Sequence, residues 1–151
     1  MAHAVEKVTT SWSPAEALAY MADFSHTVEW DPGVIEAHRL DDGEIGKGSA
    51  FILTVRAAGR RLPMRYEITE FCADRVTFAA RMATLASTDT VAVAALGGTT
   101  EVTYDARINF RGLLRLADPL LALAFRGVAK RAIRGLGERL GRPAVEAVEP
   151  H

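Results

Sequence analysis

The strongest constraint in this sequence is a run of strand-like segments followed by one long helical segment. Between residues 34 and 110 the apolar residues alternate with polar ones in period two, and only short turns interrupt the pattern. The six segments are residues 34–40, 49–57, 61–71, 75–82, 87–96 and 101–110. Short connections favour antiparallel pairing of neighbouring strands. This part of the chain therefore predicts an antiparallel meander without an intervening helix.

The N-terminal region predicts one further strand and two short helices. Residues 4–10 alternate as a strand, which brings the expected sheet to seven strands. Ser13 can cap a helix that has Pro14 at its first position and Glu16 three residues after the cap, the pattern of a capping box. A second short helix is expected over residues 24–30, before the turn at residues 31–33.

The C-terminal region predicts a long amphipathic helix from Pro119 to about Leu140. Asp118 can act as its N-cap, and Pro119 suits the first helical position. Apolar residues recur at spacings of three and four along one stripe, while Arg126, Lys130 and Arg134 fall on another face. One helix cannot cover seven strands unless the sheet curls around it. We therefore expect a space between the sheet and this helix, with the two short helices closing one end.

Three short motifs give the chain a family resemblance. They are Trp-Asp-Pro-Gly at residues 30–33, Gly-Lys-Gly at 46–48 and Gly-Thr-Thr at 98–100, in the order of segments just described. Over essentially its whole length the sequence resembles the START-like (SRPBCC) superfamily, and within it the polyketide cyclase/dehydrase-type proteins. The resemblance implies an α+β helix-grip fold with a hydrophobic cavity between sheet and C-terminal helix. It does not imply a single chemistry, because the superfamily includes aromatic cyclases as well as lipid and hormone binders.

Length and composition bound the remaining possibilities. A chain of 151 residues with 49% hydrophobic residues, 25% charged residues and a net charge of −1 is typical of one globular domain. We expect a single START-like domain over residues 1–142 and a disordered C-terminal tail over residues 143–151. The single cysteine, Cys72, suits a reducing cytosol. We further expect a cytoplasmic monomer or homodimer with no secretory leader, no stable membrane insertion and no nucleic-acid partner.

The charges are unevenly distributed along the chain. Residues 1–45 hold two basic residues against nine acidic ones, whereas residues 111–142 hold eight against two. The favoured interpretation is that an acidic front and a basic helix neutralise each other within one domain. The alternative is that the basic helix face, with Arg126, Lys130 and Arg134, contacts a membrane or a partner.

Strand register identifies the side chains that face the cavity. If Gly97 and Gly98 form a two-residue turn, residues whose numbers sum to 195 lie opposite each other. The opposite pairs on the apolar side are Val93 with Val102, Val91 with Tyr104, and Asp89 with Ala106. With the same alternation on the other strands, the expected cavity residues are Phe24, Trp30, Phe51, Leu53, Met64, Tyr66, Phe78, Val91, Tyr104, Leu121, Phe125 and Ala129. For Phe24 and Trp30, plain core packing is the favoured alternative.

Four side chains are candidates for proton transfer: Asp89, Tyr66, Tyr104 and His26. A carboxyl group on an apolar face has a raised pKa and can accept a proton from an activated carbon. The favoured alternative for Asp89 is a solvated position at the end of its strand, because buried unpaired acids are rare. For His26 the favoured alternative is a surface or capping role.

Other chemistries lack their motifs. Residues 43–49 lack the phosphate-loop spacing, and no zinc-hydrolase or serine-hydrolase motif occurs. We expect no metal and no cofactor. The sequence then ranks three functions: first, binding of a polyketide, lipid or isoprenoid-like molecule; second, an aromatic polyketide cyclase or dehydratase; third, docking on a membrane or partner through the basic helix.

Overall fold

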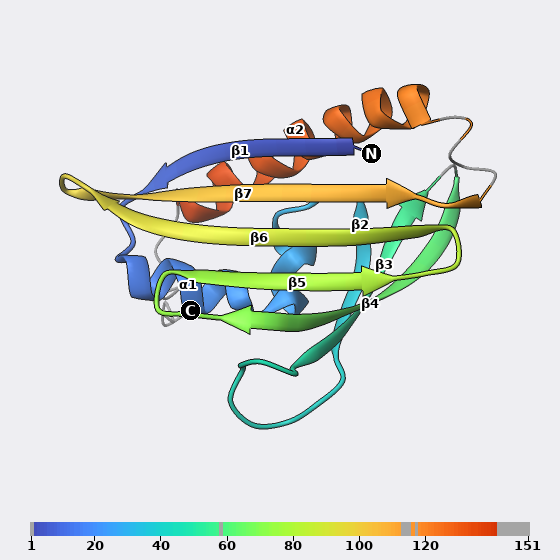
Figure 1. Cartoon of the computed structure of the whole chain (residues 1–151). Coiled ribbons are helices and arrows are strands. Elements are labelled where there is room, and N and C mark those ends of the chain that lie inside the picture. The colour runs from blue at the N-terminus through green and yellow to red at the C-terminus, as the bar shows by residue number, and fades with distance from the viewer. Residues whose placement is uncertain (1, 58, 113–115, 117, 142–151) are drawn as a thin grey trace, which may run out of the picture.

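The computed structural model describes residues 2–57, 59–112, 116 and 118–141 (Figure 1). The predicted tail over residues 143–151 lies outside the described part of the chain. Ten elements follow one another within these described residues. They are β1 (Ala2–Thr10), α1 (Pro14–Ala22), the 3₁₀ helix η1 (Phe24–Glu29), β2 (Val34–Arg39), β3 (Ala50–Ala57), β4 (Arg60–Phe71), β5 (Arg75–Arg81), β6 (Leu85–Leu96), β7 (Thr99–Phe110) and α2 (Asp118–Leu140).

The strands form one antiparallel sheet in the order β1-β7-β6-β5-β4-β3-β2 (Figure 1). Every pair of neighbours is antiparallel. Register shifts interrupt the pairing of β2 with β3 and of β4 with β5, and such irregularities increase local twist. The predicted α+β class, meander and curled seven-stranded sheet are confirmed.

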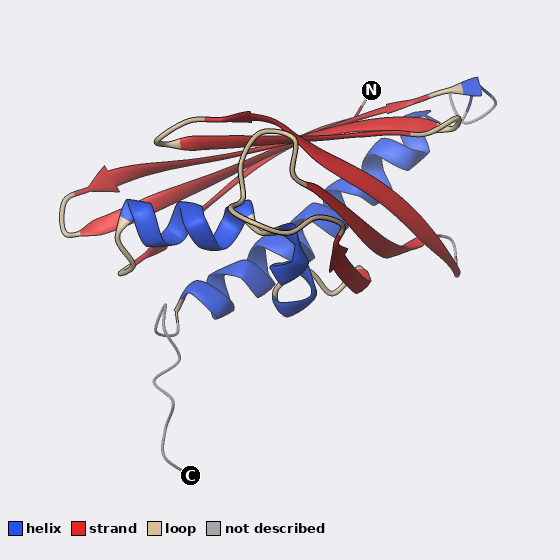
Figure 2. Cartoon of the chain, turned by 90° about the horizontal axis from the view of Figure 1, so that it is seen from below, coloured by secondary structure: helices blue, strands red, loops and turns tan. Residues whose placement is uncertain are grey.

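The helices form where the local sequence predicts them, on one side of the sheet (Figure 2). Ser13 caps α1, and its hydroxyl accepts a hydrogen bond from the Glu16 N–H while the Glu16 side chain accepts one from the Ser13 N–H, a complete capping box. The second helix is a 3₁₀ helix capped by Asp23, whose carboxylate accepts a bond from the Ser25 N–H.

The C-terminal half of α2 is firmly anchored. Leu136 and Leu140 are fully buried, and the Thr10 hydroxyl donates a 2.7 Å hydrogen bond to the Leu140 carbonyl oxygen. Gly135 lies against the Trp30 carbonyl, where a Cβ atom would overlap the oxygen. Because α2 packs chiefly along β1, it leaves part of the curled sheet uncovered. Within the described residues, no helix is both long and apolar enough to cross a bilayer.

An aromatic cluster fills the end of the sheet that α1 and η1 cover. The Phe24 ring stacks on the Phe78 ring with 3.6 Å between centroids, and Phe51 packs against both. All three side chains are at most 1% exposed. This end of the sheet is therefore a close-packed core.

Candidate functional site

A cavity of about 530 Å³ lies between α2 and the other end of the inner sheet face. Six elements and the η1–β2 loop contribute to its wall. The lining residues are Ala4, Glu6, Trp30, Asp31, Pro32, Gly33, Val55, Arg56, Ala57, Leu62, Met64, Tyr66, Leu85, Ser87, Asp89, Tyr104, Ala106, Ile108, Phe125, Val128, Ala129, Arg131, Ala132, Ile133 and Leu136. Most of them are apolar, so the wall suits a hydrophobic guest.

The inner face of each long strand is divided between the cavity and the packed core. On β6, Ser87 and Asp89 line the cavity, whereas Val91 and Val93 belong to the core. On β4, Tyr66 lines the cavity and Ile68 does not. Since β6 and β4 run in the same direction in the sheet, the cavity occupies one common end of it.

A small polar cluster is buried in the cavity wall. The Tyr104 hydroxyl donates a 2.6 Å hydrogen bond to Asp89 Oδ2, and the Ser87 hydroxyl donates one of 3.0 Å to Asp89 Oδ1. Asp89 is only 8% exposed and Ser87 only 3%. Each carboxylate oxygen therefore has a donor, which accounts for the presence of an acid among apolar side chains.

Burial dominates the proton affinity of this cluster. It raises the pKa of Asp89 from 3.8 to about 6, although the hydrogen bonds from Tyr104 and Ser87 favour the carboxylate. Burial, followed by the charge of Asp89, raises the pKa of Tyr104 and of Tyr66 well above 10.0. Asp89 thus changes protonation near neutral pH, while both tyrosines remain protonated donors.

Trp30 lines the cavity, and its carbonyl oxygen lies against Gly135 of α2. Its ring meets the Tyr104 ring edge-on with 5.7 Å between centroids, and it is 5% exposed. The following residue, Asp31, accepts a 2.8 Å bond from the Gly33 N–H. Burial raises the pKa of Asp31, and the Gly33 bond and the charge of Arg131 oppose the shift. All four residues of the Trp-Asp-Pro-Gly segment line the cavity, so the segment forms one of its walls.

Six of the predicted cavity residues lie in its wall: Trp30, Met64, Tyr66, Tyr104, Phe125 and Ala129. The other six do not, so for them the prediction is corrected: Phe24, Phe51, Leu53, Phe78, Val91 and Leu121. Phe51, Leu53, Phe78 and Val91 lie on the predicted inner face, and Phe24 of η1 packs against that face, but the side chains beneath α1 and η1 pack closely there. Leu121 lies near the start of α2, before the part that covers the cavity.

The structure also decides the position of each proton-transfer candidate. Asp89, Tyr66 and Tyr104 come together in the cavity wall, so the favoured alternative of a solvated Asp89 is wrong. The strand continues four residues beyond Asp89 towards its N-terminus, to Leu85, which keeps the carboxylate away from the strand end.

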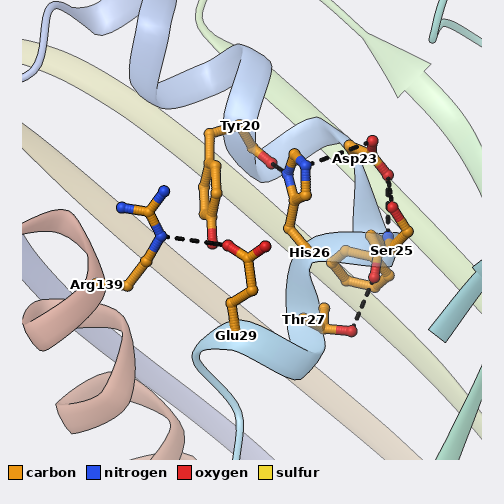
Figure 3. A network of polar contacts seen from close by, with 8 residues as sticks. Tyr20, Asp23, Ser25, His26, Thr27, Glu29 and Arg139 are labelled. Carbon is orange, nitrogen blue, oxygen red and sulfur yellow. Dashed lines mark hydrogen bonds and ion pairs between the residues drawn. The ribbon is translucent and has the colours of Figure 1, made fainter. Parts of the chain in front are cut away.

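His26 lies outside the cavity, in a separate polar network (Figure 3). Its Nδ1 is 2.9 Å from the Tyr20 carbonyl oxygen, and its ring stacks on the Tyr20 ring. The Tyr20 hydroxyl donates a 2.6 Å bond to Glu29, which also accepts a 3.2 Å bond from Arg139 of α2 (Figure 3). This network joins α1, η1 and α2, and it gives His26 a local structural role.

Ser87 and Asp31 are two polar residues among the cavity residues that the sequence prediction did not include. The same register pairs Ser87 with Ile108 and so places Ser87 on the inner face. A polar residue two positions from Asp89 on an apolar face was the signal that could have identified it. Asp31 had no such signal, because an aspartate in an Asp-Pro-Gly turn is ordinarily solvated. Its partial burial depends on α2, which is distant in the sequence.

Comparison with known proteins identifies relatives over nearly the whole chain. Residues 1–141 match the family model described as polyketide cyclase/dehydrase and lipid transport. No curated protein matches the sequence.

Similar solved structures share the fold at low sequence identity. The Zhui aromatase/cyclase from Streptomyces sp. R1128 is 12% identical with a TM-score of 0.79, over 97% of both chains. A START superfamily protein from Mycobacterium smegmatis is 14% identical with a TM-score of 0.74, over 91% of this chain and 96% of the other. A STAR-related lipid transfer protein from Xanthomonas axonopodis is 14% identical with a TM-score of 0.71, over 91% of this chain and 85% of the other.

Proposed function

The chain belongs to the polyketide cyclase/dehydrase and lipid transport family, and on that premise we propose that it binds a hydrophobic small molecule between α2 and the sheet. The guest is a polyketide, a lipid or an isoprenoid-like molecule that carries at least one oxygen. Its apolar body lies against the walls, and its oxygen meets the cluster of Asp89, Ser87 and Tyr104.

One observation carries this proposal. A cavity of about 530 Å³ with mostly apolar walls contains one buried cluster of polar groups. Ligand sites of roughly 300–1,000 Å³ typically combine apolar walls with a few placed polar groups. Burial of the guest's apolar surface supplies most of the affinity, and the polar cluster sets its orientation.

Asp89 gives the site a choice of hydrogen-bond roles. Its carboxylate accepts a bond from a guest hydroxyl, whereas its protonated form donates one to a guest carbonyl. Since the pKa of Asp89 is about 6, both forms are available near neutral pH. A hydroxyl-bearing guest should bind more tightly as the pH rises through this value, and a carbonyl-bearing guest less tightly.

Filling the cavity tests the proposal. Ala129 lines the cavity from α2, whereas Ala124 on the same helix is exposed and does not. Ala129→Phe should weaken binding of the fluorescent probe 1-anilinonaphthalene-8-sulfonate by about tenfold or more, because the new ring occupies the guest's space. Ala124→Phe adds the same ring elsewhere and should leave the affinity unchanged. Equal affinities for the two variants would refute binding in this cavity.

A second function, an aromatic polyketide cyclase or dehydratase, is favoured by the buried Asp89–Tyr104 pair. The Asp89 carboxylate would take a proton from a carbon next to a guest carbonyl, and the electron pair of that C–H bond would pass into an enolate. The Tyr104 hydroxyl would then have to exchange its bond to Asp89 for one to the enolate oxygen. A base acts over about 2.6–3.2 Å from the proton-bearing atom, so the guest must approach the cavity wall closely.

Conservative variants separate this chemistry from binding. Asp89→Asn keeps the side-chain volume but removes the base, and turnover should fall by about 100-fold or more while probe binding persists. Tyr104→Phe and Tyr66→Phe test the two donors in the same way. Turnover of the wild type should increase as the pH rises through about 6, where Asp89 loses its proton. If turnover survives all three substitutions, these side chains do not transfer protons, and the cavity promotes the reaction only by positioning the guest.

A further inference from the structure

The outward face of α2 carries apolar side chains that no described element covers. Leu116, just before the helix, is 84% exposed, Leu120 is 72% exposed and Leu123 is 66% exposed. Exposed leucines are unremarkable when scattered, but contiguous ones mark an interaction surface. Leu120 and Leu123 are three residues apart in α2, so they share one face of the helix, and Leu116 precedes that helix.

The same face continues with basic residues. Lys130 and Arg134 extend the stripe at helical spacing, and Arg126 and Arg131 flank it. All four are exposed. Among the described residues, Arg126, Lys130 and Arg134 form no ion pair, although Arg139 on the inner side pairs with Glu29. Mutual neutralisation of the acidic and basic regions therefore does not extend to this face.

Three acidic residues lie together in one exposed loop, whereas Glu138, four residues after Arg134, is an exposed acid on α2 itself. Asp41, Asp42 and Glu44 belong to the loop between β2 and β3, which projects from the side of the molecule opposite the start of α2 (Figure 1). The outward face of α2 is thus mainly basic and apolar, with Glu138 as one acid among its bases, and a cluster of three acids lies in a separate loop. Such a charge separation orients a protein in the field of an anionic surface.

The face also borders the cavity mouth. Val128 lines the cavity and is nevertheless 40% exposed, and Arg131 lines it while its side chain remains exposed. A surface in contact with this part of α2 would therefore lie next to the opening of the cavity.

We propose that the outward face of α2, formed by Leu120, Leu123, Arg126, Lys130 and Arg134, docks the protein reversibly on an anionic lipid surface. Leucines at helical spacing enter the boundary between headgroups and acyl chains, and neighbouring bases attract anionic headgroups. Because Arg126, Lys130 and Arg134 have no ion-pair partner among the described residues, we expect this face to prefer an anionic surface to a neutral bilayer. Within the proposed binding function, docking would let a hydrophobic guest move between the bilayer and the cavity without crossing water.

Vesicle flotation tests docking without any knowledge of the guest. The full chain is mixed with phosphatidylcholine vesicles, with or without phosphatidylglycerol, and the bound fraction is measured at low and at high salt. One variant combines Leu120→Gln with Leu123→Gln, and another combines Lys130→Glu with Arg134→Glu. Matched controls change exposed residues outside α2: Leu40→Gln with Leu96→Gln, and Lys47→Glu with Arg65→Glu. Far-UV circular dichroism reports whether each variant is folded, and probe binding in the cavity is measured separately.

The wild type should float with the phosphatidylglycerol vesicles, and salt should reduce the bound fraction. Each α2 variant should bind about tenfold or more weakly, while both controls behave as the wild type does. Absence of flotation, or equal loss in the controls, would overturn the proposal. So would a dimer that forms without lipid and dissociates in the Leu120–Leu123 variant, because the face would then bind a second copy of the chain. These outcomes are independent of probe binding, so failure of docking and failure of cavity binding are distinguishable.

Discussion

The two ends of the inner sheet face follow the same alternation but differ in what covers them. At one end Phe24 from η1 stacks on Phe78 of β5, and the space is filled. At the other end α2 crosses above Asp89 and Tyr104 at a distance that leaves a cavity of about 530 Å³. The alternation along a strand therefore identifies which side chains lie on the inner face of the sheet. Whether such a side chain belongs to the packed core or to the binding site depends on the helix that covers it.

The largest expected difference between the ends concerns stability. Phe78→Ala at the packed end should lower the free energy of unfolding by about 3–5 kcal/mol, because the surrounding rings cannot close the space. Phe125→Ala in the cavity wall should cost only about 1–2 kcal/mol, since this side chain is already partly exposed. Urea denaturation of both variants measures the difference. Equal losses would mean that the cavity end is as closely packed as the core.

A second expected difference is the pH dependence that Asp89 gives to the cavity end. Its pKa is about 6 in the folded state and 3.8 when exposed, so the unfolded chain releases its proton first as the pH rises. The contribution of Asp89 to the free energy of unfolding should therefore fall between about pH 4 and pH 6 and then level off, by up to roughly 3 kcal/mol.

Asp89→Asn isolates this contribution. Most of the decrease should disappear in the variant, and a smaller decrease from Asp31, whose pKa is also raised, should remain. Thermal unfolding across this pH range provides the measurement. A variant with the same pH profile as the wild type would show that Asp89 is solvated.

Gly135 provides a smaller test, where α2 meets Trp30. A methyl group at this position would overlap the Trp30 carbonyl oxygen, so Gly135→Ala should destabilise the protein by about 1–3 kcal/mol. Gly127→Ala on the same helix meets only the end of the Arg131 side chain, and it should stabilise the protein by up to about 1 kcal/mol. If both substitutions stabilise the helix, the close approach at Trp30 is absent.

The fold was predictable because its signals are local. The capping box of Ser13 and Glu16, the two-residue turn at Gly97 and Gly98 and the period-two segments are all present as expected. The register derived from that turn correctly places Asp89 opposite Ala106 and on the inner face. Each of these features depends on residues close together in the sequence.

The extent of the cavity was not predictable in the same way. Phe51 and Tyr66 both lie on inward positions of neighbouring strands, yet only Tyr66 lines the cavity. The difference arises from Phe24 and from the path of α2, whose contacts are distant in the sequence. Asp31 was missed for the same reason, since it is only partly buried and lies in the cavity wall with Arg131, about 100 residues further along the chain.

The most direct test of the account is an NMR titration with 2-naphthol, an apolar ring system that carries one hydroxyl. If the cavity binds such guests, backbone amide signals of Ser87, Asp89, Tyr104 and Ala129 should shift progressively with probe concentration. Signals of Phe51 and Phe78, in the packed core, should remain in place. Shifts confined to the packed core, or none at all, would contradict the assignment of the cavity end as the binding site.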